Sequence, residues 1–205
     1  MSQGELTIDD YELVNCIATG NVSQVWEVRG VTSGKSYAMK LLLPEALTDN
    51  EQKRTMRHEA SVMSKLEHPN IVQFVESHIA RKQAYIIMEL FRSVNLKALL
   101  RSDLHATHLR IKRVMECVTQ ALAYMHESKW IHKDVKPDNI LVTKGGEVRV
   151  IDFSLAPKVC WSSYIQISSM MTFFSVSKSS FRKAGRMMSA RISIARSWYS
   201  GSTVA

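Results

Sequence analysis

The chain has 205 residues, of which 45% are hydrophobic and 22% charged, and its formal net charge is +8. This composition supplies enough apolar side chains for one core or two small lobes, and it excludes a disordered or fibrous chain. Residues 153–205 hold seven of the 27 basic residues and none of the 19 acidic ones, so residues 1–152 carry a net charge of only +1. A nearly neutral body gives no electrostatic sign of nucleic-acid binding.

Targeting signals and cysteine spacing indicate where the protein is expected to be located. The sequence contains no run of about 18 apolar residues, so it predicts no membrane span. Its first residues are acidic and lack the apolar centre of a secretory signal. Cys16, Cys117 and Cys160 lie far apart without metal-ligand spacing, as is typical of reduced thiols. We therefore expect a cytoplasmic protein.

The first half of the chain is predicted to form a sheet with one inserted helix. Strand-like runs predict five strands, at 11–18, 23–29, 36–42, 72–78 and 84–89. The first two alternate around the break at 19–21, and Thr32-Ser33-Gly34 is a turn into the third. Between the third and fourth strands, Thr48 or Asp49 is suited to cap a helix that runs to about Leu66. The breaker His68-Pro69-Asn70 follows that helix.

The second half is mostly helical. A long amphipathic helix places seven apolar residues on one face: Ile111, Val114, Met115, Val118, Ala121, Leu122 and Met125. Two short strands follow at 140–143 and 148–151, joined at Gly145-Gly146. Five strands with one helix, followed by mostly helix, indicate an α+β chain in two lobes.

The composition changes at about Pro157. Residues 158–205 contain 13 serines and no Pro, His, Asp or Glu, and no helical or alternating periodicity is sustained there. We expect this segment to be disordered, and to originate from a frameshift or from alternative splicing. The alternative is a genuine divergent tail, such as a membrane-surface or phosphorylated segment.

Two features of the first half are suited to phosphate chemistry. Residues 17–25 form a loop with few large side chains, where backbone N–H groups can approach phosphates, although a simple hairpin turn at Gly20-Asn21 also explains it. Lys40 lies in the middle of an apolar strand, and a buried ammonium needs a carboxylate or phosphate partner. Glu59 is the candidate partner, and a lysine at the surface is the alternative.

A loop after the long helix gathers polar side chains of three kinds. Residues 131–141 place Asp134, Lys136 and Asn139 close together in sequence. An aspartate can accept a proton from a hydroxyl, a lysine can neutralise phosphate, and an asparagine oxygen can bind Mg²⁺. Asp152, at the end of the following strand, is suited to the same cation.

In this order the motifs resemble those of the eukaryotic-type, or Hanks-type, protein kinases over about residues 10–157. Tyr-Ala-Met-Lys at 37–40 is similar to Val-Ala-Ile-Lys, His-Lys-Asp at 132–134 to His-Arg-Asp, and Asp-Phe-Ser at 152–154 to Asp-Phe-Gly. The resemblance implies that Asp134 is the base, that Lys136 contacts the γ-phosphate, and that Lys40 holds the α- and β-phosphates while paired with Glu59. It also implies that Asn139 and Asp152 bind Mg²⁺. A lysine two residues after the base, followed by Pro137, is the serine/threonine pattern.

The resemblance further implies an ATP pocket. Met88 corresponds to the gatekeeper, the backbone of 89–91 to the adenine-binding segment, and Asn95 to a polar contact with the ribose. The positions that it assigns to the nucleotide are Ile17, Gly20, Val25, Ala38, Lys40, Met88, Glu89, Phe91, Asn95 and Leu141.

Several positions depart from the family pattern. Ala18 and Ser23 replace glycines of the phosphate loop, which is expected to weaken ATP binding. Lys133 replaces an arginine that pairs with an activation-loop phosphate, so it keeps the charge without the bidentate fork. Ser154 replaces a glycine but leaves the carboxylate of Asp152. After Pro157 we find no activation segment and no Ala-Pro-Glu motif, so the kinase domain is expected to be truncated there.

These observations predict a two-lobed kinase-like fold. We expect an N-terminal extension at 1–10, a kinase domain at 11–157, and a tail at 158–205. The N-lobe, 11–89, would hold a five-stranded antiparallel sheet and one helix, and 90–157 would begin a truncated, mostly helical C-lobe. Without its usual cover, the helix face of residues 111–125 would be an exposed apolar patch suited to a partner.

The expected function is transfer of the ATP γ-phosphate to Ser/Thr hydroxyls of a protein substrate, with Mg²⁺ as cofactor. The alternative is an inactive nucleotide-binding module that acts as a decoy or regulator. The interpretation as a nucleic-acid-binding protein is supported only by the charge of the tail, and we do not expect this function.

Overall fold

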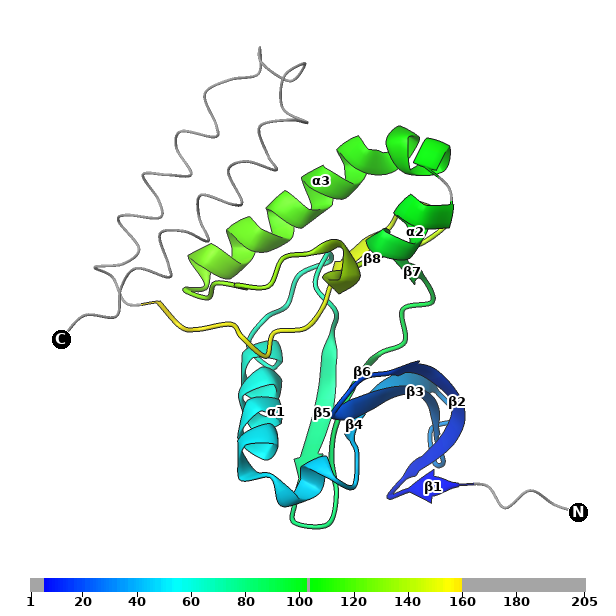
Figure 1. Cartoon of the computed structure of the whole chain (residues 1–205), viewed down its shortest axis with the longest axis vertical. Coiled ribbons are helices and arrows are strands. Elements are labelled where there is room, and N and C mark those ends of the chain that lie inside the picture. Colours follow the sequence, from blue (N-terminus) through cyan, green and yellow to red (C-terminus); the bar gives the residue numbers. More distant parts are fainter. Residues whose placement is uncertain (1–5, 103, 160–205) are drawn as a thin grey trace, which may run out of the picture. The chain divides into compact units, whose positions relative to one another are not determined.

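The computed structural model describes residues 6–102 and 104–159. They lie within the first of the two compact units into which the chain divides, residues 1–159. The expected α+β order is found: a sheet with one inserted helix, then helices with a small second sheet (Figure 1).

The larger sheet is antiparallel and has the strand order β1-β2-β3-β4-β6-β5. Its members are β1 (Thr7–Ile8), β2 (Tyr11–Thr19), β3 (Ser23–Gly30), β4 (Ser36–Leu42), β5 (Phe74–Ile79) and β6 (Ala84–Glu89).

The predicted count of five strands is wrong by one strand, because β1 forms inside the expected N-terminal extension. A turn at Asp9, with φ of 48°, pairs Thr7 with Glu12 and Ile8 with Tyr11. The half-buried Ile8 packs against the apolar cluster on that side of the sheet. A strand of two residues has no alternation that a sequence pattern can reveal.

The two faces of this sheet belong to different apolar clusters. Met39 and Ile87 join one cluster, together with Tyr11, Val28 and Tyr85. Leu42 and Ile86 join the other, which includes the inserted helix. Because side chains alternate along a strand, Ala38 and Lys40 share the face of Leu42. The fold thereby turns Lys40 toward the side of the sheet that the helix covers.

That helix is α1 (Asn50–Met63), preceded by the short 3₁₀ turn η1 (Ala46–Thr48). Asp49, one of the two predicted caps, accepts a hydrogen bond from the N–H of Glu51 at 2.7 Å. The helix ends three residues before the predicted Leu66. Its buried residues recur at helical spacing and include one charged side chain: Met56, Glu59, Ala60, Val62 and Met63.

The second half contains two helices and a three-stranded antiparallel sheet in the order β7-β8-β9. Its elements are β7 (Val94–Asn95), α2 (Leu96–Ser102), α3 (Leu104–Glu127), the 3₁₀ turn η2 (Pro137–Asn139), β8 (Ile140–Val142) and β9 (Val148–Val150). The halves are tied together at β9, where Val72 N–H donates to Val150 O at 3.1 Å and Val150 N–H donates to Asn70 O at 2.8 Å.

The expectation of an exposed face on residues 111–125 is wrong for most of that face. Val114, Val118, Ala121 and Met125 are buried, together with Cys117. They pack into the core that also contains β8, β9 and Phe153, so the smaller sheet covers them. Ile111, Met115 and Leu122 are half-buried.

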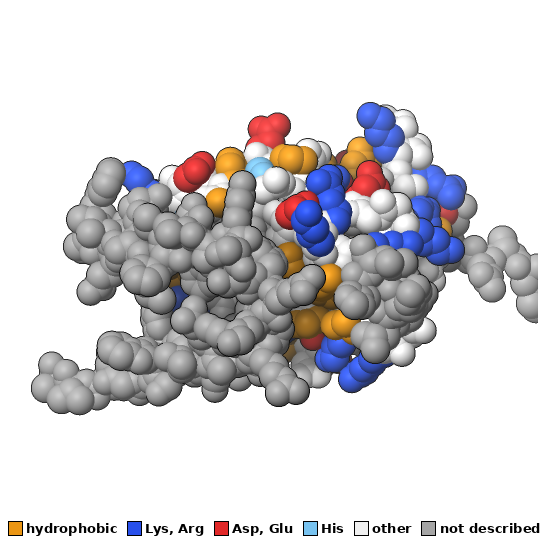
Figure 2. Space-filling model, turned by 90° about the horizontal axis from the view of Figure 1, so that it is seen from above, with side chains coloured by type: hydrophobic (Ala, Val, Ile, Leu, Met, Phe, Trp, Pro, Cys, Tyr) orange, Lys and Arg blue, Asp and Glu red, His pale blue; other side chains and the backbone are white. Residues whose placement is uncertain are grey.

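Acidic and basic side chains are interspersed on the face shown in Figure 2, with hydrophobic side chains between them. None of the described helices has the length and apolarity needed to span a bilayer. The expected disorder and origin of the tail concern residues that, apart from Lys158 and Val159, lie outside the described ones.

Candidate active site

Lys40 and Glu59 form an ion pair between β4 and α1. Lys40 Nζ lies 2.6 Å from Glu59 Oε2, and the Glu59 side chain is only 4% exposed. Burial raises the pKa of Glu59 above its usual value, and the positive charge of Lys40 opposes this effect. The lysine that the sequence placed in an apolar strand therefore has its carboxylate partner in the structure.

Asp152 lies beside this pair. Its Oδ1 is 3.8 Å from Lys40 Nζ, and the Ser154 hydroxyl donates to the same oxygen at 2.8 Å. Burial raises the pKa of Asp152, but the charge of Lys40 and the hydrogen bonds from Ser154 outweigh it and leave the pKa below its usual value. Asp152 is thus a carboxylate at neutral pH, as a cation ligand must be.

The loop before β8 brings three predicted residues together. Lys136 Nζ donates to Asp134 Oδ2 at 2.6 Å, and Asn139 Nδ2 donates to the same oxygen at 3.0 Å. The hydrogen bond to Asp134 raises the pKa of Lys136, so its ammonium persists at neutral pH. Ile151 N–H donates to Asn139 O at 3.1 Å, which joins this loop to the residue before Asp152.

His132 connects the same two segments, a role that the sequence motif alone did not show. Its side chain is buried, its Nε2 lies 3.0 Å from Ile151 O, and its Nδ1 accepts from Asp134 N–H at 3.3 Å. The ring packs against Phe153, with centroids 5.2 Å apart. A carbonyl can only accept, so Nε2 carries the hydrogen and the ring is neutral.

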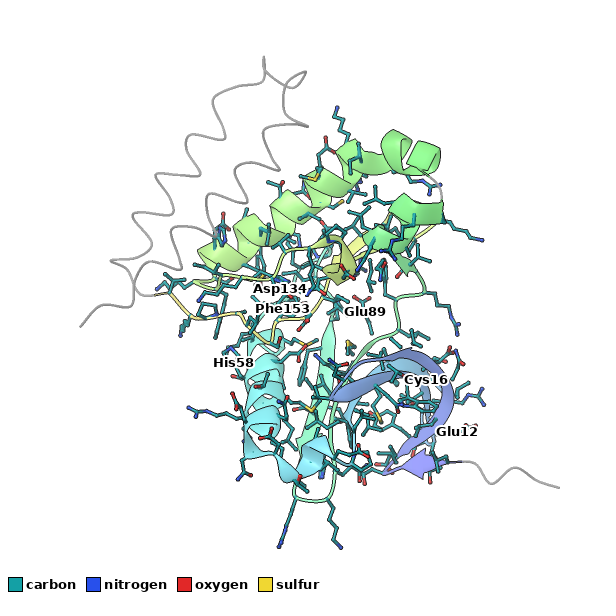
Figure 3. All side chains as sticks on the ribbon, in the orientation of Figure 1. Glu12, Cys16, His58, Glu89, Asp134 and Phe153 are labelled. Atoms are coloured by element: carbon teal, nitrogen blue, oxygen red, sulfur yellow. The ribbon has the colours of Figure 1, made fainter. Side chains whose placement is uncertain are left out.

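Two residues of this site also have strained backbone conformations. Lys133 and Asp152 both have φ of 65°, a left-handed conformation that is uncommon outside glycine. Such residues cluster at functional sites, where the surrounding structure holds them. Asp134 and Phe153 lie near one another between the sheet and the helical half (Figure 3).

We expect the buried, neutral His132 to make the fold sensitive to acid. Burial lowers the pKa of His132 from 6.5, so between pH 6.5 and the lowered pKa the unfolded chain binds a proton that the folded chain does not. The free energy of unfolding should therefore fall between pH 7.5 and 5.5, by up to about 1.4 kcal/mol for this residue. Urea titrations at both pH values measure it.

The matched variant for this prediction is His132→Gln, which keeps an N–H donor but does not titrate. Burial also lowers the pKa values of His68 and His126, so these residues act in the same direction and remain in the variant. The variant should lose part of the pH dependence. An unchanged dependence in His132→Gln would contradict the assignment.

The residues predicted to contact adenine lie on β3, β4, β6 and β8. Ala38 is buried and pairs with Met88 across the ladder, while Val25 pairs with Lys40. Val25, Met88 and Leu141 are half-buried.

Gly20 lies in the exposed loop between β2 and β3. Gly20 N–H donates to Ser23 O at 2.8 Å, and a Cβ at this glycine would approach the same oxygen to 3.3 Å. The hairpin turn that the sequence offered as the alternative is therefore present, within the segment that resembles a phosphate loop. Ile17, also assigned to the nucleotide, is 49% exposed.

Three further nucleotide positions have side-chain partners that the sequence did not reveal. Arg149 Nε donates to Glu89 Oε1 at 2.7 Å, and the Arg149 guanidinium lies 4.6 Å from the centre of the Phe91 ring. Asn95 Oδ1 accepts from Ala98 N–H at 2.7 Å, at the start of α2. The Glu89 carboxylate and the Asn95 oxygen therefore support the fold. In the backbone of 89–91, Glu89 N–H donates to Gln73 O at 2.9 Å and Phe91 O accepts from the Ser93 hydroxyl at 3.0 Å.

The donor set fits a magnesium ion that a nucleotide helps to hold. The described residues contain no group of three His, Cys, Asp or Glu side chains that could bind a metal alone. Mg²⁺ instead often uses one or two protein oxygens together with phosphates and water. The Asp152 carboxylate could supply one such oxygen. The Asn139 amide oxygen could supply the second, because the amide nitrogen donates to Asp134.

Ser154 should stabilise the fold through its bond to Asp152. Removing the hydroxyl in Ser154→Ala is expected to lower the free energy of unfolding by about 1 kcal/mol. Hydrogen bonds to charged groups contribute more to stability than bonds between neutral groups, but partial solvation of this carboxylate reduces the contribution. Urea unfolding at pH 7.5 measures the change. Ser154→Thr keeps a hydroxyl and should lose less; equal losses in both variants would contradict the role of the bond.

Comparison with known proteins agrees with this geometry. The family profile described as "Protein kinase domain" matches residues 11–176, and so continues past the boundary expected near 157. "Serine/threonine-protein kinase PknA" of Mycobacterium tuberculosis is 34% identical over 154 residues, which cover 73% of this chain and 36% of that protein. "Serine/threonine-protein kinase PrkC" of Bacillus subtilis is 28% identical over 161 residues, 78% of this chain and 25% of that protein.

A third similar protein is "Probable serine/threonine-protein kinase CPE1738" of Clostridium perfringens, 31% identical over 168 residues. Those residues cover 82% of this chain and 24% of that protein. The chain thus spans about a quarter to a third of the length of these relatives.

Proposed function

The chain belongs to the protein kinase family, and from this premise we propose that it transfers the γ-phosphate of Mg·ATP to serine or threonine hydroxyls of a protein substrate. One observation carries the proposal: the Lys40–Glu59 pair lies 3.8 Å from Asp152, whose segment is joined to the Asp134 loop. This arrangement supports the proposal, because phosphoryl transfer is catalysed by positioned charges that bind and neutralise phosphate.

Each side chain has a role in this proposal. Lys40, held by Glu59, binds the α- and β-phosphates, and Lys136 neutralises charge on the γ-phosphate. Asn139 and Asp152 hold Mg²⁺, which shields phosphate charge when bound. Asp134 takes the proton of the substrate hydroxyl while the hydroxyl oxygen forms a bond to the γ-phosphorus. The bond between the γ-phosphorus and the bridging oxygen breaks, and ADP leaves.

The preference for serine and threonine rests on the chain itself and on its relatives. Lys136, followed by Pro137, matches the serine/threonine form of the catalytic loop. The three relatives are all named as serine/threonine kinases, one of them as a probable one.

A phosphotransfer assay tests the proposal. The full chain is incubated with γ-labelled ATP, Mg²⁺ and casein, and the labelled residues are identified after acid hydrolysis. We expect labelled phosphoserine or phosphothreonine, dependent on Mg²⁺. Binding of Mg·ATP without any transfer would overturn the proposed activity and leave the alternative, a nucleotide-binding module.

A further inference from the structure

His58 joins α1 to the segment that follows Asp152. His58 Nε2 lies 2.8 Å from the backbone oxygen of Ala156, a residue 98 positions further along the chain. Because a carbonyl oxygen only accepts, Nε2 donates this bond. The ring also meets Trp130 edge-on, with centroids 6.3 Å apart. In Figure 3, His58 lies on the side of α1 that faces this segment, within the helix.

The acceptor is held from its other side as well. Ala156 is fully buried, and its N–H donates to Phe153 O at 3.0 Å. Ile131 N–H donates to Pro157 O at 3.2 Å, and Val159 N–H donates to Lys129 O at 2.8 Å. The carbonyl of Ala156 is therefore a fixed point against which the helix can be positioned.

Glu59 is the next residue of the same helix turn. Its carboxylate meets Lys40, and it also receives a hydrogen bond from the backbone of Phe153. Successive residues of a helix point about 100° apart. Contacts from both His58 and Glu59 therefore fix the rotation of α1 about its axis as well as its distance from β4. The Lys40–Glu59 bond alone does not fix both.

We infer that His58 is a positioning residue: its hydrogen bond to Ala156 holds α1 where Glu59 meets Lys40. Without this bond, α1 can rotate or withdraw, and the Lys40 ammonium loses the partner that orients it toward phosphate. The effect on ATP rests on the proposed function, whereas the effect on helix position does not.

Two variants separate the hydrogen bond from the aromatic packing. His58→Gln keeps a donor nitrogen the same number of bonds from Cα but lacks the ring, and His58→Phe keeps an aromatic ring but lacks the donor. Arg57→Ala, at the exposed neighbouring position, is the control for a change on this turn of the helix. Phenylalanine has about the same helix propensity as histidine, so helix propensity does not explain a loss in His58→Phe.

The experiment is amide hydrogen exchange of the full chain, read in peptides from α1 and from residues 152–159, together with Mg·ATP affinity. We expect His58→Phe to accelerate exchange about fivefold in both segments and to weaken Mg·ATP by a similar factor, the size of one lost hydrogen bond. His58→Gln and Arg57→Ala should remain within about twofold of the original chain.

Two results would overturn the inference: His58→Phe that exchanges like the original chain, or His58→Gln that exchanges like His58→Phe. If the original chain binds no Mg·ATP, the proposed function fails, while the exchange of the two segments still decides the role of His58. A variant that lacks a cooperative unfolding transition is replaced by His58→Asn, a shorter donor that should rescue only in part.

Discussion

Replacing Asp134 by asparagine is expected to lower phosphoryl transfer about 10²- to 10⁴-fold, the usual contribution of a general base. Asparagine has nearly the same shape and keeps an oxygen that can accept from Lys136 and Asn139, so the loop should retain its structure. What it loses is the capacity to take the proton of the substrate hydroxyl. Initial rates with γ-labelled ATP measure the effect, and binding of Mg·ATP should change little.

The control for this variant is Glu147→Gln, which neutralises an exposed carboxylate in the turn between β8 and β9. It should transfer phosphate at nearly the original rate. Activity that survives unchanged in Asp134→Asn would mean that Asp134 is not the base, or that the observed transfer comes from another enzyme in the preparation.

Lys40→Met is expected to have the largest effect on stability. Glu59 is only 3% exposed, and without Lys40 its carboxylate is buried with no opposite charge beside it. Breaking a buried ion pair from one side usually costs several kcal/mol, and we expect a loss of about 2–4 kcal/mol in the free energy of unfolding. Urea unfolding at pH 7.5 measures this loss.

Two comparisons identify the cause of that loss. Lys40→Met combined with Glu59→Gln removes the unpaired charge and should recover part of the stability. Arg92→Met breaks a different ion pair, with Glu27, in which the arginine side chain is 71% exposed, and it should cost under about 1 kcal/mol. If Lys40→Met lowered the free energy of unfolding no more than Arg92→Met does, the unpaired buried charge would not be the cause of the loss.

The local parts of this structure could be predicted from the sequence. The strands β2 to β4 and β6 each extend over six or more residues, which is long enough for a sequence pattern to predict them, and Asp49 precedes α1 as a capping residue should. The predicted partners Lys40 and Glu59 do meet, because a charged residue in an apolar strand requires compensation. In each case the signal lies within a few neighbouring residues or in one pair of motifs.

The parts that could not be predicted depend on contacts between distant segments. Burial of Val118 and its neighbours on α3 follows from where β8 and β9 pack, which the periodicity of the helix does not contain. The bond from Arg149 to Glu89 spans 60 residues, and that from His58 to Ala156 spans 98. Such pairs have no sequence signature of their own, and only the assembled fold reveals them.

The central claim is that these side chains form one site for Mg·ATP, and thermal unfolding of the full chain tests it most directly. Melting is compared with no ligand, with ATP and EDTA, and with Mg·ATP, for the original chain and for Asp152→Asn. At 100 times its Kd, Mg·ATP should stabilise the original chain by about 2.7 kcal/mol. We expect much smaller shifts without Mg²⁺ and in Asp152→Asn. No shift in the original chain, or an equal shift in the variant, would contradict the claim.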